Sequence, residues 1–288
     1  MLRPCLILIL LLLLPAPAPA LAEPLRVVAS TFPLWLITRN VARDVPDLQV
    51  DLLIPARAGC PHDYALNPRE MLRLAGADLL ILNGMGLDSF VLRSLESGGK
   101  APRLIDTSAA VSGRIEGNPH LFASPALSAL LAERVGAALA EQDPGHAADY
   151  LRNAEEYAGR MRVLAGELAA LGARLGHPAV LVQHDIFDYL ARDAGLTVAG
   201  TIGSPEGQEP SAARLLALRK LLAAGKVAAV IAEPQYPDRL GRILAETGGI
   251  PLLTLDPAAG GPADASLDYF SRTMLRNIQT LEKALGSR

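Results

Sequence analysis

The sequence predicts an α/β protein of two lobes, each a mostly parallel sheet flanked by helices, joined by one long rigid helix. Short apolar segments alternate with helix-like segments in both halves of the chain, a pattern typical of parallel sheets covered by helices. Between the two halves runs a single apolar stripe with helical spacing. The order of the two patterns therefore predicts lobe, helix, lobe.

In the first half, Asn67 and Pro68 mark the start of one helix, as a cap followed by proline at the first helical position. The strands expected in this half are residues 25–29, 50–54, 78–82 and 104–105, and the first helix is 33–41. The strands expected in the second half are 179–182, 197–199, 227–231 and 252–255, with helices at 186–193, 211–224, 238–246 and 267–285.

The middle of the chain predicts one helix over residues 144–175. Its apolar positions are spaced alternately three and four residues apart, which places them on one face: Ala147, Tyr150, Ala154, Tyr157, Met161, Leu164, Leu168, Leu171 and Leu175. Such a helix is ~48 Å long at 1.5 Å per residue. A dimeric coiled coil is an alternative, but strand–helix alternation resumes directly afterwards, which favours a spine between two lobes.

The N-terminus has the features of a signal peptide. Arg3 precedes an apolar run over 6–14, and Ala20-Leu21-Ala22 forms a cleavage site that predicts removal of residues 1–22 and a periplasmic location. The run is shorter than the ~20 residues that span a bilayer. We therefore expect an N-terminal lobe at 23–142, the connecting helix at 143–177 and a C-terminal lobe at 178–288.

The charge and the cysteine count argue against a nucleic-acid partner and against a disulfide-stabilised fold. The net charge is −3, and no basic face of the kind that binds nucleic acid is evident. After cleavage Cys60 is the one remaining cysteine, so no internal disulfide is expected. Cys60 is interpreted as a small buried residue, with an auxiliary metal or redox thiol as the alternative.

Four residues at expected loop or strand-exit positions are candidate metal ligands. His62 and His120 each follow a proline in a loop, whereas His184 and Asp256 each follow an expected strand. Binding groups gather at such positions in α/β folds, and Zn²⁺ takes about four nitrogen, oxygen or sulfur donors. Taken singly, each histidine is also explained as a surface residue or a satisfied core residue.

Two further histidines border the long helix. His146 lies near its start and His177 just past its end, and both are interpreted as residues with local structural contacts. His177 is placed to interact with the negative end of the helix dipole.

Seven segments of the chain, in this order, carry a resemblance to a known family: Pro61-His62-Asp63-Tyr64, Asn83-Gly84-Met85-Gly86-Leu87-Asp88, Asn118-Pro119-His120, His184-Asp185-Ile186-Phe187-Asp188-Tyr189-Leu190, Glu209-Pro210-Ser211, Ala232-Glu233-Pro234-Gln235-Tyr236 and Leu255-Asp256-Pro257. They are similar to the zinc/manganese solute-binding proteins of bacterial ABC importers, the helical-backbone metal receptors of cluster A-I. The likeness covers essentially the whole mature chain.

The resemblance implies a ligand set of His62, His120, His184 and Asp256, and two α/β lobes on a rigid helix. The chain departs from the family at 121–125, where the family usually has an aromatic and an acid and this chain reads Leu121-Phe122-Ala123-Ser124-Pro125, and at 106–117, a short segment without histidine. Asp63, Asp185, Glu206 and Glu209 are available to support the ligands but are not assigned individually.

The function expected from this resemblance is capture of Zn²⁺, as transported ligand, in a cleft between the lobes, followed by delivery to an ABC permease in the inner membrane. Three imidazoles favour Zn²⁺ over the alternative Mn²⁺, for which a carboxylate in place of His184 would be better suited. We expect a monomeric, non-enzymatic protein. The alternatives are a zinc-dependent periplasmic hydrolase with three histidines and a bound water, and a surface adhesion protein.

Overall fold

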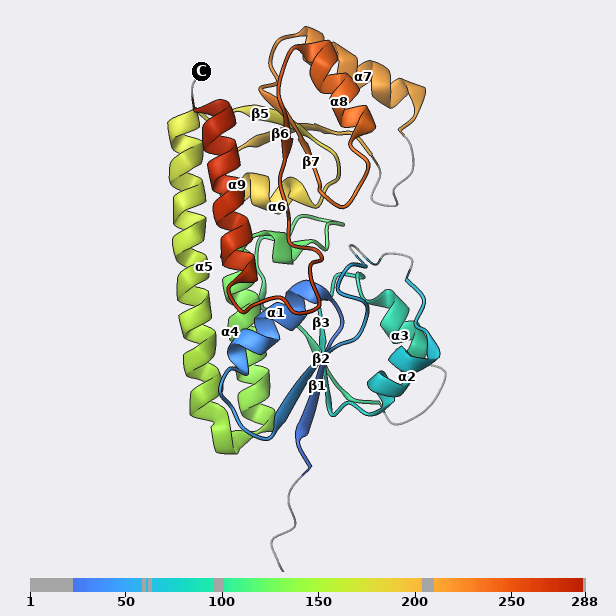
Figure 1. Ribbon diagram of the computed structural model, residues 1–288, viewed down its shortest axis with the longest axis vertical. Helices are drawn as coiled ribbons and strands as arrows, with labels where there is room; N and C mark the ends of the chain where they lie inside the picture. The colour runs from blue at the N-terminus through green and yellow to red at the C-terminus, as the bar shows by residue number, and fades with distance from the viewer. Residues whose placement is uncertain (1–22, 59–60, 62–63, 96–100, 204–209, 287–288) are drawn as a thin grey trace, which may run out of the picture.

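The computed structural model describes residues 23–58, 61, 64–95, 101–203 and 210–286, and within them two parallel four-stranded sheets lie one beyond the other along the molecule (Figure 1). This confirms the predicted fold class. The expected signal peptide, Cys60 and His62 lie outside the described residues.

The first sheet has the strand order β2-β1-β3-β4, with all neighbours parallel. Its strands are β1 (Leu25–Ala29), β2 (Leu48–Leu52), β3 (Leu79–Leu82) and β4 (Arg103–Asp106). The helices of this half are α1 (Phe32–Val41), α2 (Pro68–Ala75) and α3 (Ser89–Leu95). Asn67 caps α2 as predicted, and Glu70 completes a capping box with it.

The second sheet repeats this order as β6-β5-β7-β8, again all parallel. Its strands are β5 (Ala179–Val182), β6 (Thr197–Thr201), β7 (Ala229–Ala232) and β8 (Leu252–Thr254). The helices of this half are α6 (Phe187–Asp193), α7 (Ala212–Ala223) and α8 (Arg239–Gly248).

Each sheet has a topological switch point, because its first strand lies between its second and its third. The switch falls between β1 and β3 in one sheet and between β5 and β7 in the other. In open parallel sheets, loops that leave the strand ends on either side of such a point diverge, and ligands bind there. We therefore expect the residues that follow these four strands to form any ligand site.

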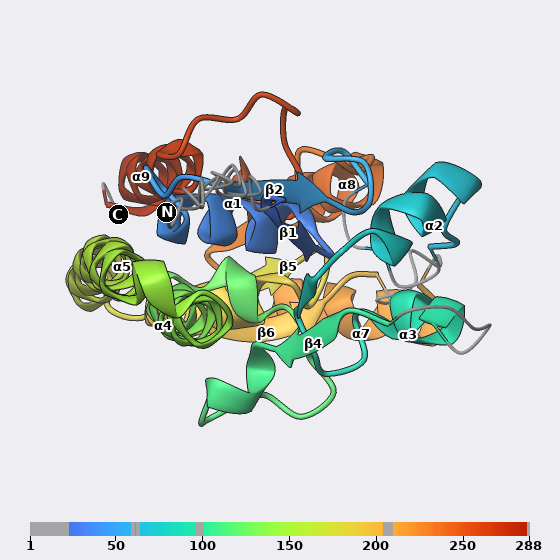
Figure 2. The same ribbon diagram turned by 90° about the horizontal axis from the view of Figure 1, so that it is seen from below.

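The spine is α5 (Ala147–Leu175), which runs along one side of both lobes beside α4 (Pro125–Gln142) and α9 (Tyr269–Leu285) (Figures 1 and 2). Most of the predicted apolar stripe is buried within this one chain, from Tyr150 through Tyr157 and Met161 to Leu171. The spine interpretation of the helix is thus correct, and burial of the stripe leaves little apolar surface for a coiled-coil partner.

The helix begins three residues later than predicted. Residues Pro144–His146 form a 3₁₀ turn, and α5 starts at Ala147. The Asp143 carboxylate stabilises this turn, because its Oδ2 lies 2.8 Å from His146 Nδ1 and accepts a hydrogen bond from the Tyr150 hydroxyl at 2.9 Å.

Helices α3 and α4 were not predicted from the sequence. Helix α4 packs against α1 and α5 and buries residues on most of its faces, including Leu131, Ala132 and Val135. A helix enclosed in this way shows no apolar stripe. Its start is nevertheless marked, because Ser124 accepts a hydrogen bond from the Leu127 amide at 3.0 Å.

The chain returns to the first lobe after β8. The Gly261 amide donates to the Ala56 carbonyl at 2.9 Å, and Arg39 donates to the Ala265 carbonyl at 2.6 Å. This crossing ties the end of the second sheet to the first lobe before α9 runs back along the spine. Among the described residues, no helix has both the length and the apolar character needed to cross a membrane.

The spine and the second lobe approach each other closely at Gly172 of α5. A Cβ atom at this position would overlap the carbonyl oxygen of Ala194, whereas one at Gly166 of the same helix meets open space. We expect Gly172→Ala to destabilise the protein by roughly 1–3 kcal/mol through overpacking. Gly166→Ala should stabilise it by up to about 1 kcal/mol, since alanine is the better helix former. Urea unfolding of both variants measures the difference, and equal effects would contradict this close packing.

Candidate metal centre

His184 and Glu233 meet at the switch point of the second sheet. His184 follows β5 after one residue, and Glu233 directly follows β7. The ladder between the strands continues past β5, because the Gln183 amide donates to the Ile231 carbonyl at 2.8 Å. His184 Nδ1 consequently lies 3.1 Å from Glu233 Oε1.

Glu233 determines which nitrogen of His184 is available to an ion. The carboxylate is 2% exposed and receives the hydrogen on Nδ1, so Nε2 is the nitrogen left to bind a metal. The Glu233 backbone amide in turn donates to the Gln183 side chain at 2.9 Å. The imidazole is thus oriented by groups that belong to the two strands beside the switch.

His120 is oriented in the same manner by Asn118. Its ring Nδ1 lies 2.9 Å from Asn118 Oδ1, and its backbone amide donates to the same oxygen at 3.0 Å. An amide oxygen only accepts, so Nδ1 carries a hydrogen and Nε2 is left for an ion. The residue is completely buried.

The segment that carries His120 is anchored to the second lobe, although it precedes the spine in sequence. Asn118 Nδ2 donates to the Asp185 carbonyl at 2.8 Å and to Asp188 Oδ2 at 3.2 Å. The Tyr189 hydroxyl donates to the Asn118 carbonyl at 3.0 Å and accepts from the Ile115 amide at 2.8 Å. Figure 1 shows this green segment beside α6, between the two sheets.

The first lobe also holds the segment that carries His120, through a hydrogen bond to Pro119. Asn83 follows β3, one of the two strands at the switch point of the first sheet, and its Nδ2 donates to the Pro119 carbonyl at 2.8 Å. The two residues that precede His120 are therefore fixed, Asn118 to the second lobe and Pro119 to the first.

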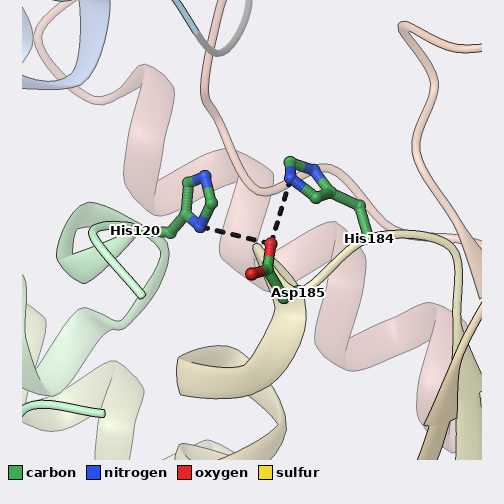
Figure 3. A group of neighbouring side chains, drawn as sticks. All are labelled: His120, His184 and Asp185. Atoms are coloured by element: carbon green, nitrogen blue, oxygen red, sulfur yellow. Dashed lines mark ion pairs between the residues drawn. The ribbon is translucent and has the colours of Figure 1, made fainter. Parts of the chain in front are cut away.

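The two histidines and Asp185 form a compact group (Figure 3). The imidazole rings of His120 and His184 lie 4.9 Å apart, centroid to centroid, in an edge-to-face arrangement. Asp185 Oδ1 lies 3.1 Å from His184 Nε2 and 3.7 Å from His120 Nδ1. One potential ligand atom from each of the three residues lies within 4.8 Å of the others.

The charges around His184 favour its protonated form. Burial lowers the pKa of the imidazole, but the hydrogen-bonding and ionic contacts with Asp185 and Glu233 outweigh burial and raise the pKa to about 9. A pKa of about 9 favours a protonated His184 at neutral pH, and a divalent cation at Nε2 would bring a charge of the same sign.

Asp256 lies two residues beyond β8 and is held by a network of its own. Its Oδ1 accepts from the Ala258 amide at 2.8 Å and from Gln235 Nε2 at 3.4 Å, and its backbone pairs with the Asn277 side chain. Burial raises the pKa of this carboxyl group, against the effect of these hydrogen bonds. Asp256 is not a member of the compact group that the described residues form.

Of the four predicted ligands, the structure therefore brings two together. His120 and His184 are adjacent, Asp256 stands outside their group, and His62 lies outside the described residues. The ligand set as a whole stays a prediction.

The other two histidines have the local contacts that the sequence suggested. His146 pairs with Asp143 before the spine helix, and His177 Nδ1 lies 2.9 Å from the Gly195 carbonyl oxygen. Neither belongs to the compact group.

Sequence reasoning missed the positioning roles of Glu233 and Asn118, and left Asp185 unassigned. For Glu233 a signal was present, because an acidic residue directly after a buried strand is a strand-exit group like His184. Asn118 gave a weaker signal, as a turn residue two positions before a histidine. The contact of Asp185 with His120 depends on the path of the segment 111–120 across the lobes.

These donors fit a divalent transition metal. Two buried imidazoles with their Nδ1 hydrogens engaged present Nε2 atoms, and carboxylates nearby offset the charge of the ion. Together the fold and the site define a two-lobed, metal-binding solute receptor built on a helical spine.

The chain belongs to the family described as zinc-uptake complex component A, periplasmic, whose family model matches residues 27–284. Among curated relatives, the chain is 25% identical to the high-affinity zinc uptake system protein ZnuA of Bacillus subtilis (strain 168), over 91% of this chain and 88% of that protein. It is 26% identical to the iron-binding protein YfeA of Yersinia pestis, over 92% of this chain and 88% of that protein.

Solved structures show the same relationship. The solute-binding protein FpvC of Pseudomonas aeruginosa, in complex with Mn²⁺, superposes with a TM-score of 0.80 at 29% identity. The match covers 92% of this chain and 99% of that one. The family is one of uptake components and not of enzymes, so the hydrolase alternative is not supported.

The contact between His184 and Glu233 predicts a pH dependence of the metal-free protein. A folded-state pKa of about 9 exceeds the unfolded value of ~6.5, so His184 stabilises the fold fully below pH ~6.5 and this contribution disappears as the pH rises through about 9. We expect Glu233→Gln to lower the pKa of His184 and to reduce the stability lost over this range.

Titration of the imidazole resonances by NMR, with urea unfolding at several pH values, measures both effects. Glu246→Gln, on the exposed surface of α8, is the control. An unchanged pKa of His184 in the Glu233 variant would contradict the assigned contact.

Proposed function

We propose that this protein captures Zn²⁺ outside the cytoplasm and delivers it to an ABC-type permease, with Mn²⁺ as an alternative ligand. The observation that carries the proposal is the pair of buried, pre-oriented imidazoles of His120 and His184, 4.9 Å apart between the two lobes. Membership of a family of periplasmic zinc-uptake components supports it.

The proposed ligand set is His62, His120, His184 and Asp256. Two of these residues are adjacent, and the resemblance implies the other two. Three imidazoles and one carboxylate match the donor number and the borderline softness that Zn²⁺ prefers. A carboxylate also offsets one of the two positive charges of a buried ion.

The proposed site of action is the periplasm, reached after cleavage behind Ala22, and the proposed partner is the permease of an ABC importer in the inner membrane. The features of residues 1–22 support export, and the family description supports a periplasmic uptake complex. The spine is continuous and packed along both lobes, so we propose that metal release involves movements of loops more than a wide opening of the lobes.

Zinc binding should stabilise the metal-stripped protein with a stoichiometry of one ion per chain. Since a ligand that binds the folded state alone adds RT ln(1 + [L]/Kd), zinc at a hundredfold excess over Kd adds about 2.7 kcal/mol. His120→Ala should abolish most of this gain, and calorimetry with thermal unfolding measures it.

His146→Ala is the matched control, because His146 pairs with Asp143 at the other end of the first lobe and lies outside the compact group. His62→Ala and Asp256→Ala should each weaken zinc binding if the proposed ligand set is complete. Equal losses from His120→Ala and His146→Ala would refute the assignment.

Zinc binding at pH 7.5 should release nearly one proton from His184. With a pKa of about 9 the imidazole is charged at this pH in the metal-free protein, and Nε2 must lose its proton to bind an ion. An unperturbed histidine with a pKa of ~6.5 would release only ~0.1 proton.

Calorimetry in two buffers of different ionisation enthalpy gives the number of protons directly. Because a proton and the ion compete for His184, zinc affinity should also fall as the pH is lowered. Release of much less than one proton at pH 7.5, with tight zinc binding, would contradict this description of His184.

A further inference from the structure

Asp185 occupies a distinctive position beside the metal-facing nitrogen of His184. It is the residue directly after His184, and Asn118 Nδ2 fixes its backbone by donating to its carbonyl oxygen at 2.8 Å. Its Oδ1 lies 3.1 Å from His184 Nε2, the nitrogen that Glu233 leaves to an ion. Figure 3 shows this carboxylate facing both imidazole rings.

The spacing of these atoms is that of donors on one ion. For metal–donor bonds of 2.0–2.2 Å at angles between 90° and 110°, two donors lie about 2.8–3.6 Å apart. The distance from Asp185 Oδ1 to His184 Nε2 falls in this range, and one nitrogen of His120 lies within 4.8 Å of both ligand atoms. His120 Nδ1, which lies 3.7 Å from Asp185 Oδ1, is engaged by Asn118, so an ion shared by the three residues requires the Nε2 of His120 to turn toward Asp185.

We infer that Asp185 is a direct metal ligand, additional to His62, His120, His184 and Asp256, and that it adapts the site to harder ions such as Mn²⁺. The inference rests on the proposed function, since it concerns the same site. It assigns to Asp185 a role that the sequence resemblance does not give it.

The chemistry of the carboxylate explains the effect on selectivity. Oxygen donors suit Mn²⁺, whereas imidazole suits Zn²⁺, and Mn²⁺ favours more donors than the four of a tetrahedral zinc site. A fifth donor that is both hard and negative therefore contributes more to Mn²⁺ than to Zn²⁺. With Asp256 it also balances the double charge of an ion held in a buried position.

The experiment compares Asp185→Asn with the wild-type full-length mature chain, stripped of metal. Asparagine keeps the size of the side chain and removes its charge. We expect Mn²⁺ affinity to fall by about tenfold or more, the scale of losses around metal sites, and Zn²⁺ affinity to fall by clearly less. The visible absorption bands of the Co²⁺-loaded protein should also change, because they report the donor set directly.

Two further variants keep the test decisive. Asp185→Glu retains a carboxylate and should preserve more Mn²⁺ affinity than Asp185→Asn, even if both lower stability. Asp238→Asn changes a partly exposed carboxylate of the same lobe that pairs with Arg242, and should leave both affinities and the Co²⁺ spectrum as in the wild type.

Both a selective loss of Mn²⁺ binding and an altered Co²⁺ spectrum are required. Equal losses for the two ions, an unchanged spectrum or unchanged affinities in Asp185→Asn would overturn the inference while leaving the proposed function intact. A wild-type protein that binds neither ion would instead refute the proposed function, and the role of Asp185 with it.

Discussion

The geometry of the site depends on the hydrogen bonds made by the side chain of Asn118. Its oxygen accepts from the ring and the backbone of His120, while its nitrogen donates to the Asp185 carbonyl and to Asp188. One buried amide thereby orients a histidine that precedes the spine and attaches it to the lobe that follows the spine. Because both halves of an amide are needed, no apolar or purely acidic residue can replace it without leaving a buried polar group unpaired.

The remaining order in the site comes from the sheets. The two lobes share one strand order, and each places polar residues at the ends of the strands beside its switch point. In the second lobe these residues are His184 and Glu233, and in the first lobe Asn83 reaches the carbonyl before His120. The spine packs against both halves of the chain, and the loop that carries His120 is tied by hydrogen bonds to both lobes.

The electrostatic character of the site follows from this arrangement. Glu233 and Asp185 favour the protonated form of His184, and the same negative charges would stabilise a metal ion bound there. Imidazole nitrogen and carboxylate oxygen stand side by side, which suits both borderline and hard divalent ions.

The fold class, the position of the spine and two of the residues that meet in the site could be predicted from the sequence alone. Strands such as Ala179–Val182 and the stripe from Tyr150 to Leu171 were predictable, because local periodicity records which faces are buried. Helix α4 escaped prediction because it is enclosed on most sides. The packing of the folded chain, and not the local pattern, places His120 against His184, Glu233 against His184 and Asp185 close to His120. These contacts join residues 49 or more positions apart, and the packing of the lobes on the spine sets their distances.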